Sequence, residues 1–191
     1  MFTINVPNVL TLLRILLVPV LVVALLDKTS DGDVLAAVVF ALASFTDAID
    51  GYIARSRNAI TTFGKLMDPV ADKLLIIAAL FSLVSLHRLP AWIAMVIVAR
   101  EFAVTVTRMA AAPTGVVIAA NWWGKTKTIV QVAAIFFLIA ISGSPLWLDL
   151  LTYFMVAITV VSGVDYFFGL RRLLREAEER RRLSADVTPQ N

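Results

Sequence analysis

Long uninterrupted runs of apolar residues constrain this chain more than any other feature of its sequence. Six stretches approach the roughly 20 residues that a helix needs to cross a bilayer. They cover residues 8–26, 33–55, 69–86, 90–112, 126–141 and 146–170. The runs are continuous, whereas the strands of a membrane barrel alternate apolar and polar residues. The sequence therefore predicts an all-α integral membrane protein, with six transmembrane helices in a single domain over residues 1–170.

The composition excludes several classes of protein. Of the 191 residues, 60% are hydrophobic and 16% are charged, against roughly 45–50% and about 25% in an ordinary soluble domain. The absence of cysteine excludes disulfides, thiolate metal sites and thiol nucleophiles. The single histidine, His87, leaves little material for a Ser-His-Asp triad or a multi-histidine metal site. The net charge of +3 does not require a nucleic-acid partner.

Basic residues predict the orientation in the membrane, because cytoplasmic loops carry an excess of Lys and Arg. The connection between the second and third predicted helices, the start of the fifth and the segment after the sixth are rich in basic residues, whereas the remaining loops contain only Lys28 and Arg88. Trp92 and Trp147 would mark the outer interface, and Trp122 and Trp123 the inner one. We therefore expect both termini to be cytoplasmic.

The two ends of the chain carry further expectations. No basic residue precedes the first apolar run, and no small-residue cleavage site follows it, so we expect the first helix to remain in the mature protein. Residues 171–191 are charged and polar. Arg172 with Glu176, and Glu178 with Arg182, lie one helical turn apart, so the last helix should continue into this cytoplasmic tail. Its arginines suit contact with the anionic leaflet.

Four aspartates lie where carboxylates are costly. Asp47 and Asp50 belong to the second predicted helix, and Asp68 and Asp72 lie at the start of the third. An ionised Asp in the middle of a lipid-embedded helix costs at least about 2.5–3.5 kcal/mol. Each pair falls on one face of its helix, so a helical hairpin can bring the four carboxylates together. Their repulsion is relieved by raised pKa values or by bound cations. With oxygen ligands only, a bound metal would be hard, namely Mg²⁺, Mn²⁺ or Ca²⁺, and two ions match four aspartates.

The neighbouring residues have both functional and structural interpretations. Gly51 and Gly64 allow a ligand to approach the backbone closely, but small residues also serve helix packing in membranes. Asp68 followed by Pro69 has the pattern of an N-cap and first helical residue. The guanidinium of Arg55 fits either bidentate binding of a phosphate or a position at the membrane interface that anchors the helix. Asp47 has no comparable structural explanation.

These residues form a pattern that resembles the signature of the CDP-alcohol phosphatidyltransferase family. Its eight fixed positions are all present: Asp47, Asp50, Gly51, Ala54, Arg55, Gly64, Asp68 and Asp72. Flanking segments are similar to the bacterial branch that uses glycerol 3-phosphate, over roughly residues 5–131. These segments are Asn5 to Asn8, Leu10-Thr11, Arg14, Phe63 to Pro69, Arg100-Glu101, Arg108, Gly124-Lys125 and Lys127-Thr128.

The resemblance implies a reaction and roles for particular residues. A six-helix, usually homodimeric enzyme of the bacterial cytoplasmic membrane would use two divalent ions, Mg²⁺ or Mn²⁺, on the cytoplasmic face. It would transfer the phosphatidyl group of CDP-diacylglycerol to the 1-hydroxyl of glycerol 3-phosphate, releasing CMP. Asp47, Asp50 and Asp68 would be metal ligands, and Asp72 would join the metal cluster and act as general base. Gly51, Ala54 and Arg55 would line the CDP moiety.

Further polar residues extend this predicted site. An anionic acceptor requires cations, and Arg14, Arg100, Arg108 and Lys125 can face the cytoplasmic half of the membrane. Arg100 and the adjacent Glu101 also fit a buried structural ion pair. The remaining cations also fit a role as membrane anchors. Thr11 shares one side of the first helix with Asn8 and Arg14, and Asn8 and Thr11 are expected to close the nucleotide pocket.

Two kinds of alternative remain open at this point. Within the same family, a CDP-dependent cardiolipin synthase or a transferase that uses inositol phosphate or serine shares the aspartate cluster. In another class, a small cation or proton transporter also places acids inside the membrane. Against transport, the four acids cluster together, no polar path leads onward to the outer side, and no helix is visibly broken in corresponding halves of the chain.

Overall fold

The computed structural model describes the chain over residues 6–27, 29–57, 62–111 and 122–186, and these ranges contain six helices. They are α1 (Val6–Leu26), α2 (Ser30–Arg57), α3 (Thr62–Ser85), α4 (Ala91–Ala111), α5 (Trp122–Ala140) and α6 (Leu146–Asp186). Some side chains inside the helices are outside the described set, namely those of residues 6–8, 30, 47–57, 62–69, 72, 110–111, 123, 170, 172–174 and 176–186.

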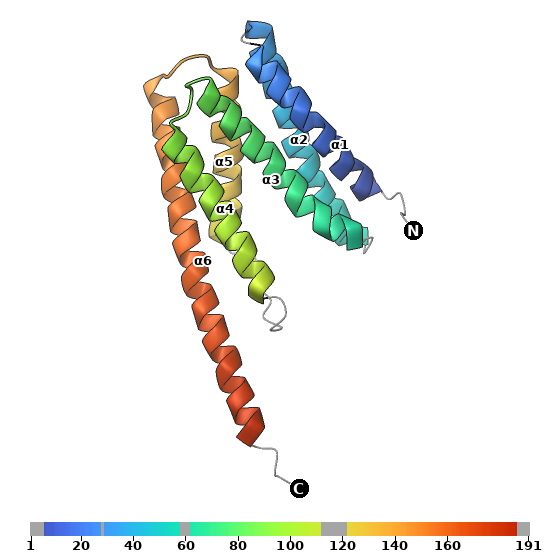
Figure 1. Cartoon of the computed structure of the whole chain (residues 1–191), viewed down its shortest axis with the longest axis vertical. Helices are drawn as coiled ribbons and strands as arrows, with labels where there is room; N and C mark the ends of the chain where they lie inside the picture. Colours follow the sequence, from blue (N-terminus) through green and yellow to red (C-terminus); the bar gives the residue numbers. More distant parts are fainter. Residues whose placement is uncertain (1–5, 28, 58–61, 112–121, 187–191) are drawn as a thin grey trace.

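The helices run alternately up and down in one bundle (Figure 1). α1 packs against α2 and α3, while α5 contacts both α2 and α6, and α4 contacts α3 and α6. The start of α1, the end of α2, the end of α4 and the end of α6 all lie towards the lower end of the view in Figure 1. We call this the inner end and the opposite end the outer end. The segments rich in basic residues therefore lie on one side of the bundle, as their distribution predicts.

The outer end shows why several helices begin and end where they do. Thr29 caps α2, because its Oγ1 accepts a hydrogen bond from the N–H of Gly32 at 3.0 Å. At the end of α3, Arg88 donates its N–H to the carbonyl of Leu83 and His87 donates to Val84. His87 has a φ of 57°, in the left-handed region. This pair of bonds closes the helix as a Schellman motif.

The apolar core lies mainly in the outer half of the bundle. Its largest fully buried apolar side chains include Leu25 of α1, Phe40 of α2, Leu83 of α3, Ile93 of α4 and Ile139 of α5. Each of these residues belongs to the part of its helix nearer the outer end. Among the described residues, the buried side chains of the inner half are more often polar. These buried polar residues are Thr11, Arg14, Lys127, Gln131, Thr159 and Ser162.

The outer surface of the bundle is strongly apolar. Large hydrophobic side chains such as Val23, Met95 and Leu146 are at least 70% exposed, and similar residues occur on all six helices. Soluble monomers rarely expose contiguous apolar surface of this extent. Two helical segments, Val9–Leu26 and Leu146–Gly169, are long and apolar enough by themselves to cross a bilayer. These observations indicate a membrane protein.

The described residues contain six helices in the predicted order, and the start of α3 lies well before its predicted position. α3 begins at Thr62 rather than at residue 69, so Asp68 and Pro69 lie inside the helix. The interpretation of Asp68 as an N-cap is therefore wrong, because the helix starts at Thr62, about two turns before Pro69. α6 continues to Asp186, as the spacing of its charge pairs predicts. It has 41 residues, which at 1.5 Å per residue is about 60 Å, twice the hydrocarbon thickness of a bilayer.

Candidate active site

The four aspartates belong to two neighbouring helix ends. Asp47 and Asp50 lie in the last turns of α2, and Asp68 and Asp72 lie in the first turns of α3. α2 and α3 contact each other, and α1 packs across both. Because α3 is continuous from Thr62, residues 64, 68 and 72 recur every four residues along one face. The backbone thus places the whole signature at the inner end, as the hairpin prediction requires.

The side chains of these aspartates lie outside the described set, as do those of Gly51, Ala54 and Arg55. Their roles as metal ligands, general base and CDP-lining residues therefore stay predictions. Among the side chains that the structure does describe, no group of three acidic or histidine residues forms a metal site. The oxygen-only donor set on two helices that contact each other fits hard divalent ions such as Mg²⁺ or Mn²⁺.

α1 contributes two buried polar residues to the inner half. Thr11 is 2% exposed and Arg14 is 1% exposed, whereas Leu12 and Leu13 between them are exposed. Thr11 and Arg14 therefore share the side of α1 that faces the bundle, as the sequence predicts. The side chain of Asn8 lies outside the described set.

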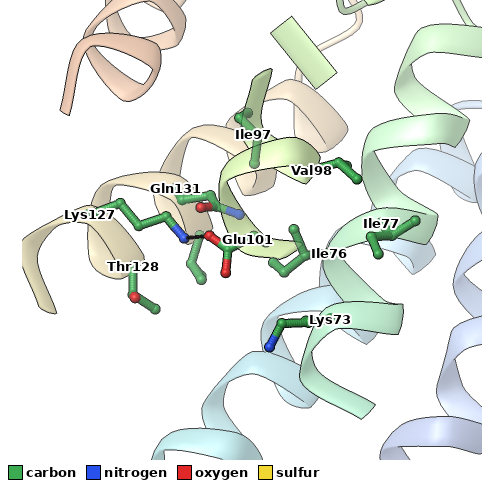
Figure 2. A pocket seen from close by; sticks show the side chains of 10 residues that line it. Lys73, Ile76, Ile77, Ile97, Val98, Glu101, Lys127, Thr128 and Gln131 are labelled. Atoms are coloured by element: carbon green, nitrogen blue, oxygen red, sulfur yellow. Dashed lines mark hydrogen bonds and ion pairs between the residues drawn. The ribbon is translucent and has the colours of Figure 1, made fainter. Parts of the chain in front are cut away.

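α4, α5 and α6 are joined by a polar network around Glu101. Figure 2 shows the part of it in which Glu101 faces Lys127. Glu101 Oε1 forms ion pairs with Lys127 of α5 and with Arg100 Nη1, the latter at 3.3 Å. Arg100 Nη2 donates a hydrogen bond to Ser162 Oγ of α6 at 3.0 Å. The ion pair of Arg100 with Glu101 that the sequence indicates is present, and Lys127 is a second partner for the same carboxylate.

A cavity lined by both polar and apolar side chains adjoins this network, and we call it the polar cavity after its polar lining residues. Its volume is about 50 Å³, and α3, α4 and α5 supply its walls. Its polar lining consists of Lys73, Glu101, Lys127, Thr128 and Gln131. Lys73 directly follows Asp72 in α3, so the cavity lies beside the helix that carries half of the acidic signature. Figure 2 shows Lys73 and Lys127 approaching the cavity from different helices.

Two further predicted cations lie nearer the surface. Arg108, near the end of α4, is exposed, and its guanidinium carbon lies 5.9 Å from the ring centroid of Tyr166 in α6. Lys125, in the first turn of α5, is also exposed. Both residues are at the inner end, but neither takes part in the network around Glu101. The predicted acceptor cations therefore divide into the buried Arg14, the partly buried Arg100 and two exposed residues.

An apolar groove lies beside the polar cavity. It has a volume of about 560 Å³ and is formed by α2, α3 and α5. Phe40, Phe45 and Phe136 are among its lining residues. Ile76 and Val132 line both the groove and the polar cavity. A charged cavity next to an apolar groove matches the two chemical parts of an amphiphilic lipid.

Three polar residues of this region are not among the site residues predicted from the sequence: Lys127, Gln131 and Ser162. Lys127 is 4% exposed, Gln131 is 3% exposed and both lie on one face of α5, four residues apart. Their polar character within an apolar run was a usable signal, because such residues usually face a bundle interior. The partner of Lys127 could not be found from spacing, since Glu101 is on another helix.

The chain is similar to known proteins over most of its length. A model of the CDP-alcohol phosphatidyltransferase family matches residues 4–164. A Bacillus subtilis (strain 168) protein named CDP-diacylglycerol--glycerol-3-phosphate 3-phosphatidyltransferase is 43% identical over 181 residues, covering 85% of this chain and 93% of the relative. A protein of Mycobacterium tuberculosis (strain ATCC 25618 / H37Rv), named probable phosphatidylglycerophosphate synthase, is 44% identical over 178 residues, covering 90% and 83%. The Rickettsia felis relative, named like that of Bacillus, is 38% identical over 174 residues, covering 88% and 96%.

Proposed function

Because the chain belongs to the CDP-alcohol phosphatidyltransferase family, we propose that it transfers the phosphatidyl group of CDP-diacylglycerol to glycerol 3-phosphate. The products are CMP and phosphatidylglycerol phosphate. The observation that carries this proposal is the name shared by relatives that cover most of the chain at 38–43% identity. The aspartate signature and the buried cations at the same end of the bundle support it. Transport, the alternative from another class, receives no support from these relatives.

The reaction requires displacement at phosphorus. The 1-hydroxyl of glycerol 3-phosphate attacks the phosphorus of the phosphatidyl group, and the bond from that phosphorus to the CMP oxygen breaks. Asp72 accepts the proton of the attacking hydroxyl. Two Mg²⁺ or Mn²⁺ ions held by Asp47, Asp50, Asp68 and Asp72 would neutralise charge on the phosphate oxygens. Gly51, Ala54 and Arg55 line the CDP moiety, and Asn8 and Thr11 close that pocket.

The cations recognise the acceptor. Arg14, Arg100, Arg108 and Lys125 contribute positive charge for the phosphate of glycerol 3-phosphate. Arg100 and Arg14 are mostly shielded from water in the structure, where a charge acts more strongly than at the surface. The apolar groove between α2, α3 and α5 has the chemistry to hold an acyl chain of the CDP-lipid. This arrangement keeps the diphosphate close to the inner end.

The proposed topology has six transmembrane helices with both termini in the cytoplasm. The alternating helix directions in Figure 1 and the basic residues at the inner end support it. Residues 1–170 then form the catalytic domain of a multi-pass protein in the bacterial cytoplasmic membrane, and residues 171–191 form its cytoplasmic tail. The active site faces the cytoplasm, and the enzyme is a homodimer.

The acceptor assay tests this function directly. Protein purified in detergent is incubated with CDP-diacylglycerol, Mg²⁺ or Mn²⁺ and radiolabelled glycerol 3-phosphate. We expect the label to enter lipid with release of CMP, and chelation of divalent ions to abolish the transfer. Phosphatidylglycerol, inositol phosphate and serine are offered in parallel. Reaction with one of these acceptors, and none with glycerol 3-phosphate, would assign the chain to a different reaction of the same family.

A further inference from the structure

One carboxylate in the inner half serves two cations. Glu101 Oε1 is paired with Arg100 Nη1 at 3.3 Å and also with Lys127 Nζ. The three side chains are only 15%, 18% and 5% exposed for Arg100, Glu101 and Lys127, respectively. Water screens such interactions weakly, so the position of each cation depends strongly on the shared oxygen. Arg100 and Lys127 would otherwise repel each other.

α6 fixes the same arginine from the other side. Ser162 Oγ accepts a hydrogen bond from Arg100 Nη2 at 3.0 Å, and donates one to the carbonyl of Thr159 at 3.0 Å. A Cβ added at Gly163 would lie 3.3 Å from Cγ of Arg100. The backbone of α6 therefore passes closely beside the arginine stem. Arg100 is held between α6 and Glu101, and Glu101 connects it to α5.

The network borders the polar cavity through Glu101 and Lys127. Glu101 and Lys127 line the polar cavity of about 50 Å³ together with Lys73 and Gln131. Gln131 Oε1 is buried and accepts no hydrogen bond from the described protein. A buried ion pair is seldom more stabilising than apolar residues of the same volume. A charged network at the wall of a polar cavity is better explained by what the cavity recognises than by stability.

We propose that Glu101 is a positioning residue that holds Arg100 and Lys127 in register to bind the phosphate of the acceptor. This proposal rests on the proposed function, and it adds Lys127 to the acceptor cations. Among the described side chains, three cations, Arg100, Lys127 and Lys73, accompany this one carboxylate in the network and the cavity lining, and positive charge there favours a phosphate. Removing the charge of Glu101 lets the two cations move apart, which weakens binding of glycerol 3-phosphate. The CDP-lipid depends on the ends of α2 and α3, so its binding does not change.

The test compares Glu101→Gln with Glu101→Asp in the full-length protein. For Glu101→Gln we expect the KM for glycerol 3-phosphate to rise about tenfold, with the KM for CDP-diacylglycerol changed by less than about twofold. Glu101→Asp keeps the charge and should restore the KM to within about threefold of the unmodified protein. A merely structural role would impair both substrates together or reduce the yield of folded protein equally in both variants. Either of these results overturns the proposal.

A second pair of variants leaves the carboxylate in place. Gly163→Ala must displace the stem of Arg100, whereas Gly169→Ala, later in α6, has no atom within 4 Å of the added carbon. We expect Gly163→Ala to raise the KM for glycerol 3-phosphate about threefold and Gly169→Ala to leave it unchanged. Equal KM values in this pair overturn the proposal. Activity of the unmodified protein separates the positioning role of Glu101 from the proposed function. If the unmodified protein transfers nothing to glycerol 3-phosphate, the proposed function itself is rejected.

Discussion

The two ends of the bundle bury charge in different ways. At the outer end, Arg88 forms a bidentate pair with Asp33, at 2.9 Å to Oδ1 and 2.7 Å to Oδ2. Ser142 donates to Asp33 Oδ2 at 2.6 Å, and Arg88 also donates to the carbonyl of Ile139 at 3.1 Å. We call this group the outer clamp. In it both carboxylate oxygens are matched by donors, and three separate segments of the chain are tied together.

The inner network around Glu101 is arranged otherwise. Two cations share one carboxylate oxygen, and a polar cavity lies alongside. A bidentate pair in which a guanidinium donates to both carboxylate oxygens, as at the outer end, suits a structural connection between helices. Positive charge beside a cavity suits a transient anionic ligand. The comparison therefore predicts that changes at the inner end impair turnover more than stability, and that changes at the outer end do the opposite.

The largest expected effect is the loss of turnover caused by a substitution at the inner end. Asp72→Asn keeps the size of the side chain and removes the proposed general base, so turnover should fall about 1,000-fold. Binding of CDP-diacylglycerol should change little, because the variant removes one of four carboxylates and leaves the CDP pocket intact. The rate constant is measured with saturating substrates and the binding by titration. Unchanged turnover would exclude Asp72 as the base.

Breaking the outer clamp should affect stability instead. Arg88→Ala leaves the carboxylate of Asp33, 8% exposed, without its bidentate partner. We expect a loss of about 3 kcal/mol in the free energy of unfolding, with kcat within about twofold of the unmodified protein. Thermal unfolding in detergent measures the first quantity. A fall in kcat without a fall in stability would remove the distinction between the two ends.

A third test concerns the outer end, where Gly32 of α2 lies close to the backbone of α1. A Cβ at Gly32 would lie 2.6 Å from the carbonyl oxygen of Ala24, a backbone atom that has little freedom to move. Gly32→Ala should therefore cost about 2 kcal/mol of stability. Gly143→Ala, at the same end, has no atom within 4 Å of the new carbon and serves as the matched control. Equal melting temperatures for the two variants would contradict the close approach.

The smallest expected effect is a gain in stability. His87 has a φ of 57° at the end of α3, where glycine avoids the strain of a side chain. His87→Gly should raise the free energy of unfolding by about 0.5–1 kcal/mol and leave the KM for both substrates unchanged. A decrease in stability would show that the imidazole contributes more at this site than the backbone strain costs.

Much of the architecture follows from local patterns in the sequence. The number and order of the six helices came from runs of apolar residues, and Thr11 and Arg14 share a buried side of α1 as their three-residue spacing predicts. The start of α3 was misplaced because Pro69 has the pattern of a helix start, although the helix already begins at Thr62. A proline in a membrane helix is tolerated when neighbouring groups satisfy the freed backbone, which a local pattern does not reveal.

The sequence by itself determined the apolar helices, the position of the aspartate signature on two consecutive helices and the family to which the chain is similar. These features depend on residue spacing and composition, which are local properties of the chain. Only the tertiary structure decided that Glu101 pairs with Lys127, that Arg88 pairs with Asp33 and that α6 passes close to Arg100. The physical reason is that these contacts join residues 26 to 63 positions apart along the chain, brought together by helix packing rather than by helical periodicity.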